Sequence, residues 1–171
     1  MTSGDDIAEA YACAELLSYL NKKGITSSED GFPIHVSIDS SLDADCFKIE
    51  ASLEEDALGM TVKGGDRRGV LYAVYHFLEE YAGFRYFTSD LETYTADDVV
   101  IPEGVVLEHT PVLAARRLTW HSIYSSMEWA VKMGVNFGIG LPADFGGQSL
   151  DYGNLFVHTI APLAGTKYPY P

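Results

Sequence analysis

The stretch that decides the fold is GGDRRGVLYAVYHFLEEYAGFRYF, residues 64–87, in which two glycines lead through two arginines into a long apolar and aromatic run. Apolar residues recur in this run every three to four positions, which is the period of one helix face, so residues 67–81 are predicted to form a helix. Because most of its circumference is apolar, we expect a sheet to cover one side and another part of the protein to cover the other. Gly83 ends the helix, and residues 84–87 are predicted to return as a strand.

The glycines at the start of this helix could hold a nucleotide or could only shape the turn. A dinucleotide-binding loop needs glycines at relative positions one, three and six, whereas Gly64, Gly65 and Gly69 stand at one, two and six. Asp66 places a carboxylate where the pyrophosphate would approach, and no Gly-Lys followed by Ser or Thr marks a P-loop. The sequence therefore predicts a tight strand-to-helix turn whose glycines let the helix lie close to the sheet.

The patterns in the rest of the N-terminal part predict a second helix and the strands of a sheet. Capping residues followed by an amphipathic pattern predict a helix over residues 5–20. Alternation of apolar and polar residues predicts strands at residues 33–38, 46–53 and 59–64, and a last short strand is predicted at residues 99–102. The predicted fold class is therefore α+β, a single mixed β-sheet with two helices packed on it.

The chain is acidic, with 11 Lys and Arg against 25 Asp and Glu and a net charge of −14. Such a surface repels phosphate groups and anionic lipids, so neither a nucleic acid nor a membrane is an expected partner. Arg67 and Arg68 at the helix start could hold an anion, but we predict that they are simple surface arginines. No motif with metal-ligand spacing occurs, so no metal and no cofactor is predicted. Cys13 and Cys46 are predicted to be buried free thiols, with a single bridge as the alternative.

The helix and its flanks resemble the small α/β domain that precedes the barrel in several glycoside hydrolases, among them β-N-acetylhexosaminidases and α-glucuronidases. The likeness is closest to a group of barrel proteins of unassigned function from polysaccharide-degrading bacteria. In that group a G-x-LY-x-VY-x-FLE helix is followed by G-x-RW-[YF], a short IP strand and a P-x-F-x-x-R first barrel strand. The matching residues in this chain are Gly69, Leu71, Tyr72, Val74, Tyr75, Phe77, Leu78, Glu79, Gly83, Arg85, Tyr86, Ile101, Pro102, Pro111 and Arg116.

The resemblance implies two domains. Residues 1–108 correspond to the accessory α/β domain and residues 109–171 to the beginning of a (β/α)8 barrel, with a helix at residues 125–133 and a second barrel strand at residues 134–140. A complete barrel takes about 250 residues, so at most two βα units fit and the barrel is truncated. The family's catalytic carboxylates lie on later strands, so whether the protein is an enzyme stays open, and the isolated chain is expected to be inactive.

The resemblance also implies candidate residues for carbohydrate binding. In hexosaminidases the arginine at the position of Arg116 hydrogen-bonds to sugar hydroxyls. An equal alternative is that Arg116 pairs with an acidic side chain. Trp120 could stack on a sugar ring or belong to a core. His121 and His158 follow predicted strands, where barrel enzymes place their catalytic and binding residues, but they could equally be packing or surface histidines.

The expected partners are an oligo- or polysaccharide, and either the remainder of the protein's own barrel or another chain. The resemblance implies an extracellular or periplasmic location, although the chain start lacks a secretory pattern. Two other functions stay open. The chain could be a non-catalytic carbohydrate-binding module, because it is rich in aromatic residues, or a protein-interaction domain, because an unfinished barrel leaves open strand edges.

Overall fold

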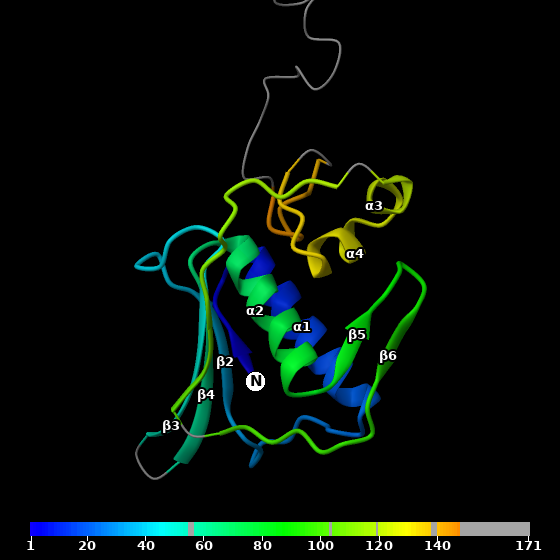
Figure 1. Cartoon of the computed structure of the whole chain (residues 1–171). Coiled ribbons are helices and arrows are strands. Elements are labelled where there is room, and N and C mark those ends of the chain that lie inside the picture. Colours follow the sequence, from blue (N-terminus) through cyan, green and yellow to red (C-terminus); the bar gives the residue numbers. More distant parts are fainter. Residues whose placement is uncertain (55–56, 103, 119, 138–139, 148–171) are drawn as a thin grey trace, which may run out of the picture.

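The structure is a computed structural model, and it describes residues 1–54, 57–102, 104–118, 120–137 and 140–147. Two long helices lie side by side on one face of a five-stranded mixed sheet, and a two-stranded hairpin stands beside them (Figure 1). The fold is therefore α+β, as the sequence predicts. The elements are β1 (Thr2–Ser3), α1 (Ile7–Lys22), β2 (Ile34–Ile38), β3 (Phe47–Glu54), β4 (Ala57–Gly64), α2 (Arg67–Glu80), β5 (Phe84–Tyr86), β6 (Glu92–Tyr94), β7 (Gly104–His109), α3 (His121–Ser125) and α4 (Met127–Lys132).

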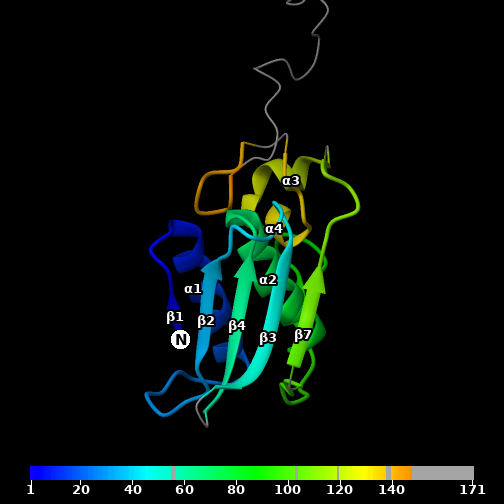
Figure 2. The ribbon, with the colours of Figure 1, turned by 90° about the vertical axis from the view of Figure 1, so that its left-hand side faces the viewer.

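The main sheet has the strand order β1-β2-β4-β3-β7. Strands β1, β2 and β4 run parallel, and β3 runs antiparallel to both β4 and β7. Figure 2 looks onto the face of this sheet that no helix covers. On β2, Ile34 and Val36 are buried toward the helices while His35 is exposed on the bare face, which is the alternation that the sequence predicts.

The glycines before α2 permit a close approach of helix and sheet, and this prediction is confirmed. A Cβ atom on Gly64 would lie 2.0 Å from the backbone nitrogen of Val70, and one on Gly69 would lie 2.4 Å from the carbonyl oxygen of Cys46. Both distances are shorter than any Cβ contact tolerates, so only glycine fits at these two positions. The turn thus brings α2 against the end of β4.

Helix α2 is buried on most of its circumference, as predicted. Leu71, Val74 and Leu78 have no exposed surface, and the helix contacts the sheet, α1 and α4. The described side chains on these contacts form the core together with those of the sheet. Helix α2 is therefore the central element of the fold.

One strand prediction and the prediction of a single sheet are wrong. Residues 99–102 form no strand, and the last strand of the described residues is β7, which begins two residues after Pro102. Proline cannot donate to a ladder, and Val99 and Ile101 pack their side chains against the core instead. Strand β5 exists as predicted, but it pairs with β6 in a separate hairpin, so the sheet is not single.

The chain after β7 lies over the end of the sheet and helices at which β4 leads into α2 (Figure 1). Helix α4 matches the predicted helix at residues 125–133. The described residues of the two predicted barrel strands form no strand, but the backbone nitrogen of Asn136 donates to the carbonyl oxygen of Arg116 at 3.0 Å. These two segments therefore lie next to each other, with α3 and α4 between them in sequence.

Candidate functional site

A buried carboxylate, that of Asp45, joins the N-terminal part of the chain to the part after β7. Its Oδ1 accepts a hydrogen bond from Arg68 Nε at 2.5 Å, and its Oδ2 accepts from Arg116 Nη2 at 3.0 Å and from Asn136 Nδ2 at 2.7 Å. Asp45 is 4% exposed and Asn136 is fully buried. We call this group the polar junction, and it consists of Asp45, Asp66, Arg68, Arg116 and Asn136.

The start of α2 positions the N-terminal half of the polar junction. Asp66 caps the helix, because its Oδ1 accepts from the backbone nitrogen of Gly69 at 2.8 Å and from that of Asp45 at 3.2 Å. Its Oδ2 accepts from Arg68 Nη2 at 2.5 Å. Arg68 Nη1 also donates to the carbonyl oxygen of Gly146 at 3.3 Å, so this arginine reaches across to the C-terminal part.

Arg116 and Asn136 hold the other half of the polar junction. Asn136 accepts from the backbone nitrogen of Arg116 at 2.8 Å through its Oδ1. The guanidinium of Arg116 donates from Nε to the carbonyl oxygen of Gly134 at 2.8 Å and from Nη1 to that of Leu113 at 2.7 Å, besides its ion pair with Asp45. All three of its nitrogens thus have partners within the chain, which agrees with the pairing interpretation of Arg116.

The prediction of two surface arginines is wrong for one of them. Arg67 lies at the surface and pairs with Asp6, with 2.8 Å between Nη2 and Oδ2. Arg68 is only 7% exposed. The signal was in the sequence, because Arg68 stands four and seven residues before Tyr72 and Tyr75 and therefore lies on the apolar stripe of the helix.

A second buried cation, Lys132 of α4, enters a cage of three tyrosines from the N-terminal part. Its Nζ donates to the hydroxyl of Tyr19 at 2.5 Å and lies 5.5 and 5.2 Å from the ring centroids of Tyr75 and Tyr86. We call these three tyrosines the tyrosine cage. The Lys132 side chain is 6% exposed, and Nζ forms an ion pair with Glu128 on the same helix. Cation–π attraction is strongest where water is excluded, so Lys132 attaches α4 firmly to α1, α2 and β5.

A pocket of about 290 Å³ opens beside the polar junction, between α2, the end of β7 and the segment that carries Arg116. The Arg116 guanidinium lies 5.3 Å from the ring centroid of Tyr72 on its wall. We call it the junction pocket, and its lining residues are Tyr72, His76, Glu79, His109, Pro111, Arg116, Lys132, Met133 and Gly134.

Two titratable side chains of the junction pocket, His76 and Glu79, have pKa values that are shifted toward their neutral forms. Burial, and then the neighbouring His109, hold the pKa of His76 below its usual value, while burial raises the pKa of the Glu79 carboxyl. The His76 ring stacks on that of His109 with 5.2 Å between the centroids, and the Phe47 ring lies at the same distance from His76 but is tilted by 40°. Groups of this kind exchange hydrogen bonds with hydroxyls, so His76 and Glu79 suit the hydroxyl groups of a polar ligand.

The other residues singled out from the sequence do not line the junction pocket. Trp120 is 71% exposed and directly precedes α3, and His121 is the exposed first residue of that helix. His158 lies outside the described residues. The structure therefore combines Arg116 with aromatic and titratable side chains that the sequence patterns did not single out.

Within the described ranges, no group of three His, Cys, Asp or Glu residues is arranged to hold a metal ion. Cys13 is half-buried and Cys46 is buried, and both are free thiols, so the single bridge is not formed. No helix in the described part of the chain is both long and apolar enough to cross a membrane.

We compared the chain with protein-family models, curated proteins and solved structures, and none of the three comparisons found a match. What the protein does is therefore argued from the polar junction and the pocket beside it.

Proposed function

We propose that this chain is the N-terminal region of a glycoside-hydrolase-like protein that acts in carbohydrate or polysaccharide degradation. In this proposal residues 1–108 are an accessory α/β domain, and residues 109–171 begin a (β/α)8 barrel that the accessory domain braces. The chain alone has no glycosidase activity, because the two carboxylates that cleave a glycosidic bond come from later barrel strands.

The polar junction is the observation that carries this proposal. Asp45 and Arg68 come from the N-terminal part, while Arg116 and Asn136 come from the C-terminal part. Charges buried in this way are strongly destabilising unless each one keeps its partner. The two parts must therefore form together, which is what a bracing domain requires.

The path of the chain after β7 also supports the proposal. In a barrel, consecutive parallel strands lie side by side with a helix between them in sequence. The segments around Arg116 and Asn136 are neighbours through their backbone hydrogen bond, and α3 and α4 separate them in sequence.

Exposed apolar side chains after β7 support a partner surface. Exposed apolar side chains that gather on one surface mark interaction sites. In this proposal, the remainder of the barrel or another chain covers this surface. Its residues and exposed fractions are Val112 (96%), Leu113 (65%), Leu118 (46%), Trp120 (71%), Tyr124 (42%) and Met133 (41%).

The ligand in this proposal is a sugar unit in the junction pocket, next to Tyr72 and Arg116. A sugar ring offers a C–H face to an aromatic side chain and hydroxyls to the neutral His76 and to Glu79. Arg116 fixes the wall of the junction pocket through its hydrogen bonds to backbone carbonyl oxygens. One of its N–H groups can donate instead to a hydroxyl group of the sugar.

Titration with N-acetylglucosamine and with glucuronic acid, followed by NMR chemical shifts, tests sugar binding. We expect saturable shifts, and we expect Glu79→Gln to weaken the affinity about tenfold, which corresponds to the loss of about one hydrogen bond. Glu80→Gln is the matched control, because Glu80 is the exposed neighbour and does not line the pocket. Equal affinity in both variants would reject the junction pocket as the sugar site.

Turnover of chromogenic hexosaminides and glucuronides tests the expected inactivity of the isolated chain. We expect no hydrolysis above the buffer rate. Clear hydrolysis by this chain alone would contradict the proposal that the catalytic carboxylates come from later barrel strands.

A non-catalytic carbohydrate-binding module is the second candidate, and the exposed indole of Trp120 favours it. Flat exposed aromatic rings stack on sugar rings in such modules. Oligosaccharides should then quench tryptophan fluorescence, and Trp120→Ala should abolish the quenching while Glu79→Gln leaves it unchanged.

A further inference from the structure

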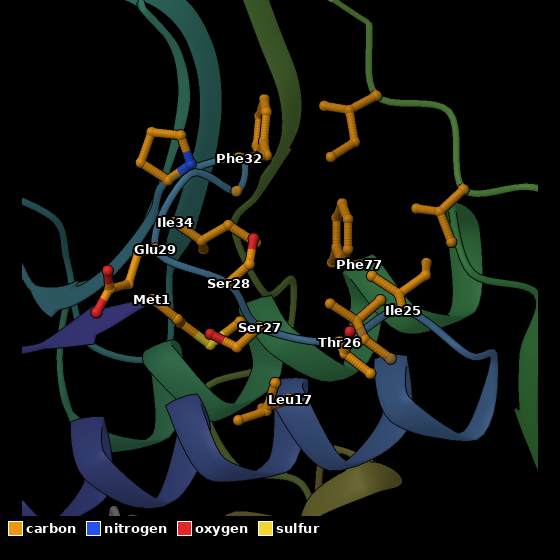
Figure 3. A pocket seen from close by; sticks show the side chains of 15 residues that line it. Met1, Leu17, Ile25, Thr26, Ser27, Ser28, Glu29, Phe32, Ile34 and Phe77 are labelled. Carbon is orange, nitrogen blue, oxygen red and sulfur yellow. The ribbon is translucent and has the colours of Figure 1, made fainter.

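We propose that a second pocket, at the opposite end of α2 from the polar junction, binds a compact uncharged amphiphile. It has a volume of about 480 Å³ and lies between α1, Phe77 near the end of α2, and the segments 25–33 and 99–101 (Figure 3). Pockets that bind small molecules range from about 300 to about 1,000 Å³. We call it the apolar pocket.

The inner wall of the apolar pocket is rigid. Leu20, Ile34 and Phe77 are 6%, 8% and 1% exposed, so the core behind them holds their side chains in place. Ile25 and Phe32 form the rim and are 41% and 38% exposed. Figure 3 shows the rings of Phe32 and Phe77 bordering the same space. A hydrophobic molecule that enters therefore replaces water at a surface that is already shaped.

Three consecutive hydroxyl groups line one side of this space. Thr26, Ser27 and Ser28 belong to the pocket lining, and within the described part of the chain their hydroxyls form no hydrogen bond. Figure 3 shows these side chains on the segment that borders the pocket. They can donate to and accept from a hydroxyl or carbonyl group, which gives the ligand a polar end.

The charges around the apolar pocket disfavour an anionic ligand. Its lining contains no Lys or Arg; the exposed Glu29 is its one charged side chain, and the α-amino group of Met1 is its one positive group. With a net charge of −14, the protein as a whole also repels anions. A fatty acid or a phosphorylated lipid therefore fits poorly, whereas an uncharged ring or short chain with one hydroxyl or carbonyl group fits both walls.

Fluorescent probes of different charge test this inference on the full chain. We expect the uncharged dye Nile red to bind saturably with a rise in emission, and the anionic dye 1-anilinonaphthalene-8-sulfonate to bind at least about tenfold more weakly. Leu17→Trp should fill the pocket from α1 and weaken Nile red binding by about tenfold or more. Phe87→Trp is the control, because Phe87 is 58% exposed and does not line the pocket.

Ile101→Trp, which fills the pocket from the opposite wall, replaces Leu17→Trp if that variant does not fold. Unchanged Nile red binding in a folded filling variant overturns the proposal, and so does equal binding of both dyes. Dye binding that appears only when the protein self-associates in sedimentation also overturns it, because the dye would then lie at an interface between two copies and not in the pocket. These outcomes are independent of sugar binding at the junction pocket, which Glu79→Gln reports.

Discussion

Replacing Asp45 by Asn removes the central charge of the polar junction with little other change. Asp45 has a φ of 63°, in the left-handed region, and Asn adopts that conformation as readily as Asp. The side-chain volume stays the same, and the amide oxygen can still accept from Asn136. The variant therefore isolates the effect of the charge on Arg68 and Arg116.

The expected loss of stability is about 3 kcal/mol. Breaking a buried ion pair by removing one partner costs about 3–5 kcal/mol. The side chains of Asp45 and Arg68 are 6% and 9% exposed, which places this pair in the buried class. The lower end of the range applies because Arg68 keeps Asp66, and because the Arg116 side chain is 21% exposed to water.

Urea unfolding measures this loss with two signals. Far-UV circular dichroism follows α1 and α2, whereas tryptophan fluorescence follows the C-terminal part, because Trp120 and Trp129 are the only tryptophans. With a slope of about 1–3 kcal/mol per molar urea, the midpoint should fall by about 1–3 M, and the fluorescence transition should come first.

Asp39→Asn is the matched control, because Asp39 pairs with Lys63 at 3.7 Å on the surface and its loss should leave the midpoint almost unchanged. The double variant Asp45→Asn with Arg116→Met should recover part of the lost stability, because it also removes the charge of Arg116, which Asp45→Asn leaves unpaired. If Asp45→Asn shifts the midpoint no further than Asp39→Asn, the polar junction does not hold the two parts together.

Three further predictions follow from the packing of α2, the tyrosine cage and the junction pocket. Gly64→Ala should destabilise the protein by about 3 kcal/mol or more, because its Cβ would meet the α2 backbone. In the control Gly59→Ala, on the same strand, the nearest atom lies 3.3 Å from the new Cβ, so this variant should lose far less stability. Thermal unfolding of the two variants measures the difference. Lys132→Met should cost about 1–3 kcal/mol in urea unfolding. Lys22→Met, which removes a lysine whose side chain is 40% exposed over the same Tyr19 ring, should cost less than about 1 kcal/mol, and equal losses would argue against the cage. Because the pKa of His76 is lowered in the folded state, the unfolded chain binds a proton more readily. As the pH drops from about 7 to about 5, the free energy of unfolding of the wild type should therefore fall more than that of His76→Gln. If the free energies of unfolding of the two proteins change with pH in parallel, this prediction is wrong.

The sequence predicts the elements whose patterns are long and regular. Helix α2 was predicted within one residue of its observed end, because its apolar stripe and the glycine turn before it indicate the same helix. Residues 99–102 were mispredicted because a short apolar run before a proline packs into a core as well as it forms a strand. Short runs carry no period that separates these two outcomes.

The candidate site was predictable only in part, because its residues meet over long sequence separations. Asp45 lies 71 residues from Arg116 and 91 residues from Asn136, so no local pattern links them. The resemblance drew attention to Arg116, but the buried environment of Arg68 and Lys132 depends on which helix faces meet. Only the helical position of Arg68 relative to Tyr72 offered a signal in the sequence itself.

The position of Asp45 in the chain has a consequence for folding during synthesis. Ribosomes add about 5–20 residues per second, so Asn136 emerges about 5–20 seconds after Asp45. In the part of that interval between the emergence of α2 and that of Arg116, Asp45 and Arg68 lack two of their later neighbours, while the apolar surface around α2 is already present. A chaperone that recognises apolar segments would therefore find its substrate in this nascent intermediate, and its release would follow the arrival of Arg116 and Asn136.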